Sequence, residues 1–518
     1  MYRIIFSLLF FFNTNVFCQE KIGNNIPEIS FLEDNTIDAP FIGHGVQWSA
    51  YPHADSDTAE WGLLMTDDKW KELYKRLDYL QPHIIRVMDV ASWRYYKGLD
   101  TEGVPIIDYN TQEVRSLYKL LDYCQHKNIK VLFGEWGTPG FWNKDKSIPG
   151  IYRADDDRWI SMIIGYLKHL IIDKGYTCIA YYNLVNEPNG FWASTDGDWD
   201  QWSKGFLKLD AALRKNDLLK YVKLVGPDAV VQWDHPTHPK KALDWVYSTI
   251  HELGSVNAMF DIHMYADQQL VRTGNLEQFL SPMHEAAKDK KKPFILGELG
   301  MKYTGELAVE NKKRGKADPQ AGADDSSMFV YDYFYGVDMA DATIQSMLAG
   351  FGSAIAWDLD DAMHTVDDKG DKTQLKKWGM WNILGEELYN NPKDLVPRPW
   401  SYVWTLLCNL LPPDSIIIKA KSSLNDKSVR CVAAKKDIDF TAIVVNQSKQ
   451  LKKYYLRTDV DTLPEKLYLY EYSENYRPVN KDNFPVYSKV LKYKSTEGGI
   501  YLEIKPNSVV FVSTILVN

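Results

Sequence analysis

Short apolar runs alternate along most of this chain with longer stretches in which apolar residues recur every three or four positions. From Phe41 to about Leu411, eight runs of strand length are separated by helical stretches, a pattern typical of repeated βα units. The predicted strands cover residues 41–48, 84–89, 130–135, 179–186, 222–227, 260–265, 293–298 and 352–358. Because an open sheet would leave two unpaired edges, the pattern predicts an α/β fold closed as a (β/α)8 barrel, the TIM barrel.

The predicted helices have capping residues and one apolar face each. Thr66 is placed to cap a helix whose first turn holds Asp67 and Asp68, and Thr111 precedes a second such stretch. Further helices are expected at residues 158–173, 202–215, 241–253, 276–288, 327–348 and 398–411. Residues 193–202 and 304–325 are expected to be long loops that wall the mouth of the barrel.

After Pro412 and Pro413 the pattern changes to short strand-like runs about ten residues apart. They cover residues 416–419, 429–434, 441–446, 454–457, 467–472, 488–493, 499–504 and 509–512. This predicts a smaller all-β sandwich domain at 413–518, behind a barrel at 41–412. Residues 19–40 show no clear period and are expected either to add a strand to the sandwich or to lead into the barrel.

The first 18 residues have the layout of a secretory signal peptide. Arg3 is followed by an apolar run from Ile4 to Phe12, and Cys18 precedes Gln19. Export is therefore predicted, to the periplasm, the cell envelope or the medium, with a lipid tether at Cys18 as the alternative to plain cleavage. Since no other stretch approaches 18 uninterrupted apolar residues, no membrane span is expected.

Composition and charge exclude some partners. The 518 residues carry a net charge of -9, without the clustered Lys and Arg that nucleic acid or an anionic membrane surface requires. The four cysteines after Cys18 are widely spaced, so buried free thiols are expected rather than a zinc site or a disulfide framework. A monomer without a cofactor is expected.

Two glutamates follow predicted strands at the end where an α/β barrel carries its chemistry. Glu187 lies between Asn186 and Pro188 after the fourth strand, and Glu298 ends the seventh. Either could be an ordinary surface carboxylate. As a pair at two strand ends, they are the arrangement that a two-carboxylate glycosidase needs.

Four further residues complete a motif set. Arg86 lies in the second strand, His263 and Tyr265 form a His-x-Tyr motif in the sixth, and Trp357 lies in the eighth. With Asn186-Glu187-Pro188 and Glu298, these residues resemble the clan of retaining glycoside hydrolases, and family 5 within it. The stretch 134–139 contains Trp136 and is closer to the Trp-x-x-Pro of families 30 and 39, which also carry an attached β-sandwich.

The resemblance implies a division of labour between the glutamates. Glu298 is expected to be the nucleophile, held ionised and aligned by Arg86 and Tyr265. Glu187 is expected to be the acid/base, with its pKa raised by the nearby negative charge and partial burial. Asn186 is suited to binding the 2-hydroxyl of the sugar.

Aromatic residues suggest where a saccharide would lie, because sugar rings stack on aromatic planes. Many tryptophans follow predicted strands, and Trp48, Trp136 and Trp357 are expected to contact the substrate, with His263 lining the site. Acidic runs at 155–157, 196–198 and 358–361 are candidate Ca²⁺ ligands, but such runs are more often helix starts, and no metal is expected.

The sequence thus predicts an exported retaining β-glycoside hydrolase that acts within a β-glucan or related hexose polymer. An exo-acting β-glycosidase of the same clan and a non-catalytic carbohydrate-binding barrel are the alternatives. A metal-dependent hydrolase on the same fold would need a His-x-His pair in the first strand, where only His44 is present.

Overall fold

Eight parallel strands close into a barrel in the computed structural model, which describes residues 26–143, 145–422, 426–460, 463–493 and 499–517. In barrel order the strands are β2 (Gly45–Gln47), β3 (Ile84–Asp89), β6 (Lys130–Glu135), β7 (Ile179–Asn183), β8 (Lys223–Val230), β9 (Met259–Asp267), β10 (Phe294–Lys302) and β11 (Ser353–Ala356). All eight predicted strands are present, and the predicted barrel is confirmed.

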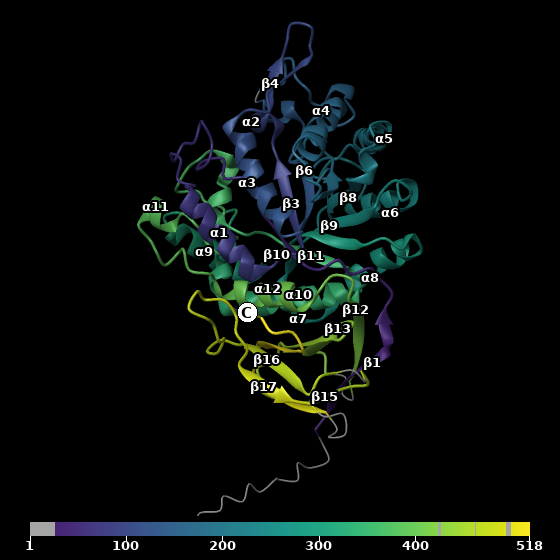
Figure 1. Cartoon of the computed structure of the whole chain (residues 1–518), viewed down its shortest axis with the longest axis vertical. Coiled ribbons are helices and arrows are strands. Elements are labelled where there is room, and N and C mark those ends of the chain that lie inside the picture. The colour runs from purple at the N-terminus through teal and green to yellow at the C-terminus, as the bar shows by residue number, and fades with distance from the viewer. Residues whose placement is uncertain (1–25, 144, 423–425, 461–462, 494–498, 518) are drawn as a thin grey trace, which may run out of the picture.

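Long helices surround the barrel (Figure 1). They are α1 (Asp67–Leu80), α3 (Gln112–His126), α4 (Asp157–Lys168, continued by a π-helical turn at His169–Asp173), α5 (Trp199–Lys215), α6 (Ala242–Glu252), α8 (Asn275–Ala287), α10 (Tyr333–Leu348) and α12 (Pro399–Leu410). Thr66 and Thr111 cap α1 and α3 as predicted, while Asp156 and Asp198 cap α4 and α5. Two of the acidic runs therefore contain helix caps.

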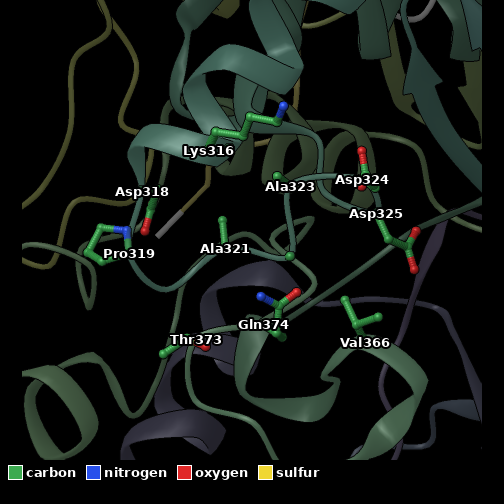
Figure 2. Close-up of a pocket in the computed structure, with 12 residues that line it drawn as sticks. Lys316, Asp318, Pro319, Ala321, Ala323, Asp324, Asp325, Val366, Thr373 and Gln374 are labelled. Carbon is green, nitrogen blue, oxygen red and sulfur yellow. The ribbon is translucent and has the colours of Figure 1, made fainter.

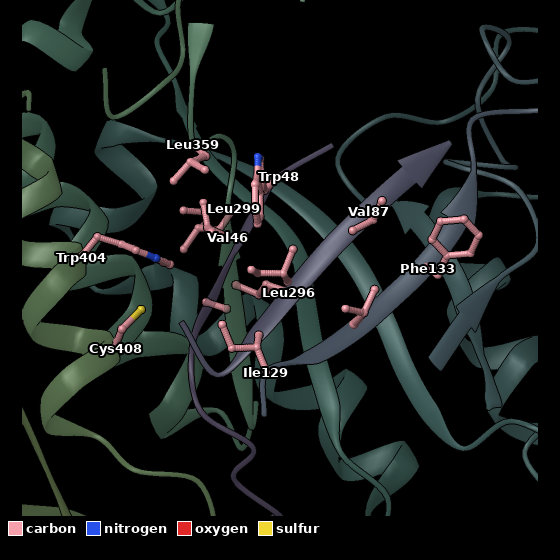
Figure 3. Packing of buried hydrophobic residues seen from close by; sticks show 14 of the residues in the cluster. Val46, Trp48, Val87, Ile129, Phe133, Leu296, Leu299, Leu359, Trp404 and Cys408 are labelled. Atoms are coloured by element: carbon pink, nitrogen blue, oxygen red, sulfur yellow. The ribbon is translucent and has the colours of Figure 1, made fainter. Parts of the chain in front are cut away.

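Two layers of apolar side chains fill the space inside and around the barrel. A ring of six buried residues fills the interior at the end away from the catalytic residues: Ile84, Leu132, Val225, Met259, Ile295 and Ile355. Outside the strands, Val46, Val87 and Leu296 face the helix layer, where Trp404 and Cys408 of α12 pack (Figure 3). The Trp404 indole N–H also donates to the backbone oxygen of Gly45, which ties α12 to the first barrel strand.

Several short elements in the connections were not predicted. They include the hairpin β4 (Tyr96–Leu99) and β5 (Pro105–Ile107), and the helices α2 (Ala91–Arg94), α7 (Gln268–Arg272), α9 (Gly305–Ala317) and α11 (Gly385–Tyr389). The prediction that 304–325 is a loop is wrong over the length of α9. In that helix only Gly315 is buried, so the sequence offers no apolar stripe by which a helix could be recognised.

The C-terminal domain is a nine-stranded sheet, which confirms the predicted all-β domain. Its order is β17 (Lys489–Lys492), β16 (Lys466–Tyr472), β19 (Ser508–Ser513), β14 (Asp439–Asn446), β13 (Val429–Lys436), β12 (Ile416–Ser422), β1 (Glu28–Ile37), β15 (Lys452–Thr458) and β18 (Ile500–Ile504). Strand β1 comes from the start of the described chain and pairs with both β12 and β15. The sheet packs on α10 and α12, at the end of the molecule opposite the β4–β5 hairpin (Figure 1).

The N-terminal segment, a possible membrane span and the cysteines were also subjects of prediction. The signal peptide at 1–18 and the tether at Cys18 lie outside the described residues. In the described part of the chain, no helix has the length and apolar character needed to cross a bilayer. Cys124, Cys178 and Cys408 are free and buried, and Cys431 is free and half-buried.

Candidate active site

Glu187 and Glu298 face one another at the carboxyl end of the barrel. Glu187 follows β7 in the left-handed region, with φ of 46°, and Glu298 lies within β10 where its pairing with β9 shifts register. One carboxylate oxygen of each, and a ring nitrogen of His263, all lie within 4.8 Å of one another. Gly297, next to Glu298, lets β10 pass close to Asp261 of β9, because a Cβ at position 297 would lie 2.2 Å from the Asp261 carboxylate.

Glu298 is buried, with 3% of the residue exposed, and is held by two donors. Arg86 donates from Nη1 to Oε1 at 2.6 Å, and the Tyr265 hydroxyl donates to Oε2 at 2.5 Å. Burial raises the pKa of Glu298, while the positive charges of His263 and Arg86 oppose that rise. The two donors fix the orientation of the carboxylate and leave it facing Glu187.

His263 lies between the two glutamates. Its Nδ1 is 2.8 Å from Oε1 of Glu187 and 3.5 Å from Oε2 of Glu298, and its Nε2 is 3.0 Å from Oδ1 of Asp228. Burial lowers the pKa of His263, but the charges of Glu298 and Asp228 outweigh it and raise that pKa well above its ordinary value. Both ring nitrogens face carboxylates, an arrangement that favours the imidazolium, in which both N–H groups donate.

Arg86, on β3, links Glu298 to Asp228 and Asn186. Besides Glu298, it donates to Oδ2 of Asp228 at 2.9 Å and to Oδ1 of Asn186 at 2.7 Å. Gln47 accepts from the same guanidinium at 3.1 Å. Since Arg86 occupies the amide oxygen of Asn186, the amide nitrogen of Asn186 is left without a partner among the described residues and is free to donate to a ligand.

Glu187 is the more accessible carboxylate, with 13% of its side chain exposed. In addition to His263, the indole N–H of Trp192 donates to Oε2 at 2.5 Å. The backbone N–H of Glu187 donates to Asp228 at 3.4 Å. Each oxygen of Glu187 thus has a donor, and a substrate oxygen could reach the carboxyl group from the solvent side.

An aromatic cavity of about 190 Å³ lies over the ends of β2, β3 and β6; no residue of the carboxylate network lines it, but Ser49, which does, binds Gln47, the partner of Arg86. Its lining includes Trp93, Trp136, Trp142, His53 and His364. Trp136 meets the edge of Trp357 at a centroid distance of 5.9 Å, and His364 stacks on Trp357 at 5.6 Å. The two predicted residues Trp136 and Trp357 are therefore in contact with each other, and Trp136 borders the cavity.

Trp48 is placed differently from the prediction. It is fully buried and packs against Trp70, Tyr74 and Tyr123 in the layer between the strands and helices α1 and α3. Its ring offers no face to a ligand, so the predicted contact with substrate is not supported. A position just after a strand does not fix whether the side chain points to the mouth or to the helix layer.

Two acidic residues of the site, Asp228 and Asp261, were not predicted. Asp228 lies one residue beyond the predicted end of the fifth strand, and Asp261 lies inside the sixth. The signal was available in the alternation of Asp261, His263 and Tyr265, since residues two apart in a strand share one face. Burial and the charge of Asp228 raise the pKa of Asp261 well above its usual range, whereas Arg86 and His263 outweigh burial and lower the pKa of Asp228.

Two sets of side chains are close enough to share a metal ion: Glu187, His263 and Glu298, and Asp228, Asp261 and His263. Arg86 and His263 already supply the positive charge within both sets, so the donor set suits an ion-pair network rather than a cation. A larger cavity of about 440 Å³ lies beyond the end of α9, between Lys316, Asp325 and Gln374 (Figure 2). None of the residues of the carboxylate network lines it.

Comparison with known proteins agrees with this geometry. The model of a family described as cellulase (glycosyl hydrolase family 5) matches residues 175–333, which contain both glutamates. None of the curated proteins compared matches the chain.

Solved structures share the whole architecture. A family 30 subfamily 8 xylanase from Clostridium acetobutylicum has a TM-score of 0.57 at 13% identity, over 94% of this chain and 99% of that chain. A family 39 β-xylosidase from Caulobacter crescentus has a TM-score of 0.55 at 14% identity, with the same coverage. A conserved exported protein from Bacteroides fragilis reaches 0.63 at 12% identity, over 94% and 100%. At these identities the likeness establishes the fold.

The family match, the fold and the facing carboxylates together define a retaining O-glycoside hydrolase. Residues 175–333 match the family 5 model, and the chain shares its fold with structures of families 30 and 39.

Proposed function

We propose that the chain is an exported enzyme that cleaves internal linkages of a β-glucan or related hexose polymer with retention of configuration. The observation that carries this proposal is the close approach of Glu187 and Glu298, whose nearest oxygens lie within 4.8 Å. Retaining enzymes need their two carboxyl groups about 5 Å apart, whereas inverting enzymes leave room for a water molecule between them.

In this mechanism Glu298 attacks the anomeric carbon while Glu187 gives a proton to the leaving oxygen. Arg86 and Tyr265 hold both oxygens of Glu298, so it needs no reorientation before attack. Once the glycosyl ester forms, the negative charge of Glu298 is gone. Glu187 then acts as the base that activates water, and Asn186 donates from its free amide nitrogen to the 2-hydroxyl.

Partly or fully exposed tryptophans that follow strands on either side of β7, which precedes Glu187, support internal cleavage. Trp93, Trp136 and Trp142 border the cavity over β2, β3 and β6. On the other side, Trp192 follows β7 and Trp233 follows β8, with 38% and 41% exposed. A polymer lying across the two glutamates would contact both groups, whereas a site for chain ends needs only one.

The N-terminal pattern supports export, as does the fold shared with a protein described as exported. The match to a cellulase family model supports a β-glucan or related polymer as the substrate.

Hydrolysis of β-glucans, mannans, xylans and galactans, with product sizes and the anomer first released recorded by NMR, tests the proposal. We expect internal cleavage and retention on at least one polymer. Glu298→Gln and Glu187→Gln should each lower kcat by about 10³-fold or more, as is usual when one member of a catalytic unit is removed. Glu306→Gln is the control, because Glu306 is exposed on α9.

Three outcomes would contradict parts of the proposal. An inverted product would rule out the glycosyl-enzyme route, and full activity in Glu187→Gln would remove the assigned acid/base. Release of single sugars or short units from chain ends only would favour the exo-acting alternative.

A further inference from the structure

A lysine beside the catalytic pair lacks an acidic partner. Lys302 ends β10, four positions after Glu298. Its ammonium lies 4.5 Å from the centroid of the Trp233 ring and 5.3 Å from that of Tyr265, the residue that donates to Glu298. The charge is thus held one aromatic ring away from the proposed nucleophile.

The surroundings of Lys302 show that the ammonium is not part of an ion pair. Across the described ranges of the chain it makes neither a salt bridge nor a hydrogen bond. The nearby carboxylate of Asp325 is bound at 2.9 Å by another lysine, Lys376. Desolvation lowers the pKa of Lys302, and the charges of Asp325, Glu187 and Glu298 oppose that fall, although none of these carboxylates lies within ion-pair distance of the ammonium.

An aromatic face with a cation beside it matches the two chemical features of an acidic sugar. The apolar C–H face of a sugar ring stacks on an indole, and an ammonium binds a carboxylate or a sulfate through charge-assisted hydrogen bonds. Trp233 is 41% exposed, so part of its ring is open to a ligand. Its contact with Lys302 keeps the ammonium close to that ring before any ligand arrives.

We propose that Lys302 and Trp233 form a subsite for a sugar that carries an anionic group, either a uronate carboxylate or a sulfate ester. The enzyme would then act on an acidic polysaccharide and prefer it to the same polymer without its charges. This inference rests on the proposed function and specifies its substrate class.

Lys302 has a second conceivable role, as a positive charge that tunes Glu187 and Glu298. The two roles differ in their effect on neutral substrates. A tuning charge would act on every substrate, because both glutamates react in every turnover. A recognition group would act only on substrates that carry the anion.

Matched polymers separate these roles. Wild type and Lys302→Met are assayed on uronate-bearing β-linked polysaccharides and on the same polymers after reduction of the carboxylates to alcohols. Sulfated polymers and their desulfated forms make the second arm. We expect wild type to prefer one charged form, and Lys302→Met to lose about 10- to 100-fold in kcat/KM on that form alone, as for the loss of a charged hydrogen bond.

Two further variants control for charge and shape. Lys302→Arg should keep most of the preference, because it retains the cation. Lys313→Met changes the net charge equally on α9, where Lys313 is 77% exposed, and should leave the preference unchanged. The preference should also weaken as salt rises.

An equal loss on charged and neutral forms in Lys302→Met would overturn the inference in favour of a tuning charge. Equal rates of wild type on both forms would also overturn it, and the proposed function would stand. To test recognition independently of turnover, glucuronic acid-containing and sulfated oligosaccharides are titrated calorimetrically into Glu298→Gln with and without Lys302→Met. If either oligosaccharide binds, and binds less tightly when Lys302 is replaced by Met, the inference is supported even without hydrolysis. If neither oligosaccharide shows binding that depends on Lys302, the inference is overturned.

Discussion

Among the buried networks of charged residues in the described chain, one lies at the barrel mouth and another between the barrel and the C-terminal sheet. At the mouth, Arg86 and His263 hold Glu298 and Asp228. At the interface, Asp341 of α10 accepts from Nε and Nη2 of Arg430, which lies on β13, and from Gln345 and Gln447. Both networks bury charged groups, but they differ in whether any of those groups can be reached by a ligand.

The interface network is closed. Asp341 and Asp338 have donors on both oxygens, supplied by Arg430, Arg272 and neighbouring glutamines. At the barrel mouth both oxygens of Glu187 and of Glu298 also have donors, but the two carboxylates face each other, Glu187 is reached by solvent, and the amide nitrogen of Asn186 has no partner among the described residues. Charges enclosed by protein therefore fix the position of two domains, whereas charges that stay accessible are available for chemistry.

Breaking the interface network should have the largest effect on stability. Arg430→Met would leave Asp341 as a buried charge without its ion-pair partner, and the unfolding free energy should fall by about 3–5 kcal/mol. Activity per folded molecule should be unchanged, since Arg430 lies on β13, far from the barrel mouth in the fold. Chemical denaturation and kcat/KM at low temperature measure the two effects.

Arg214→Met is the control for this experiment. Arg214 pairs with Asp210 at 3.2 Å with 65% of its side chain exposed, so the loss should be at most about 1 kcal/mol. A similar effect for both variants would show that the interface network contributes no more than a surface ion pair.

Removing one hydrogen-bond donor at the barrel mouth should lower activity and leave stability nearly unchanged. Tyr265→Phe deletes the hydroxyl that binds Oε2 of Glu298, and kcat should fall by about 10²- to 10³-fold, the usual cost of one donor to a reacting group. Tyr472→Phe deletes a buried hydroxyl at the interface that donates at 2.6 Å to the backbone of Tyr333. It should lower stability by about 1 kcal/mol and leave kcat unchanged. A small effect of Tyr265→Phe on kcat would mean that Arg86 alone aligns Glu298.

A smaller effect is expected from pH. Because the pKa of Glu298 is raised by burial, the carboxylate takes up a proton at a higher pH than an ordinary glutamate. Activity should therefore be full above that raised pKa and fall as the pH drops through it. For the same residue, protonation removes a buried charge, so its contribution to stability improves as the pH falls. The acid limb of kcat should be reversible and precede unfolding; coincidence with loss of near-UV circular dichroism would contradict this.

The two ends of the barrel also show what the sequence could predict. Strands such as β3 and β6 could be predicted because their N-terminal halves are apolar. Those halves supply Ile84 and Leu132 to the ring of residues that fills the barrel interior. Glu187 and Glu298 stood out as charged residues that end such runs. Asp228 did not, because it follows Gly226 and Pro227, which read as the end of a strand although β8 continues to Val230.

The direction in which a side chain points at a strand end could not be predicted from the sequence either. Trp48 and Trp136 both follow barrel strands, yet Trp48 is buried in the helix layer and Trp136 borders the aromatic cavity. Lys302 shows no pattern of its own in the sequence, since its position depends on Trp233 and Tyr265 from two other strands. Such contacts between distant segments follow from closure of the barrel and not from local periodicity.

The position of β1 in the C-terminal sheet means that this sheet cannot be completed until almost the whole chain has been synthesised. This strand joins β12 to β15, so the antiparallel pair β15 and β18 is hydrogen-bonded to the rest of the sheet through it. During synthesis the first strand to emerge must wait for partners made more than 350 residues later. A strand from before the barrel therefore completes the sheet formed by the residues that follow it, and the C-terminal domain is built from both sides of the barrel sequence.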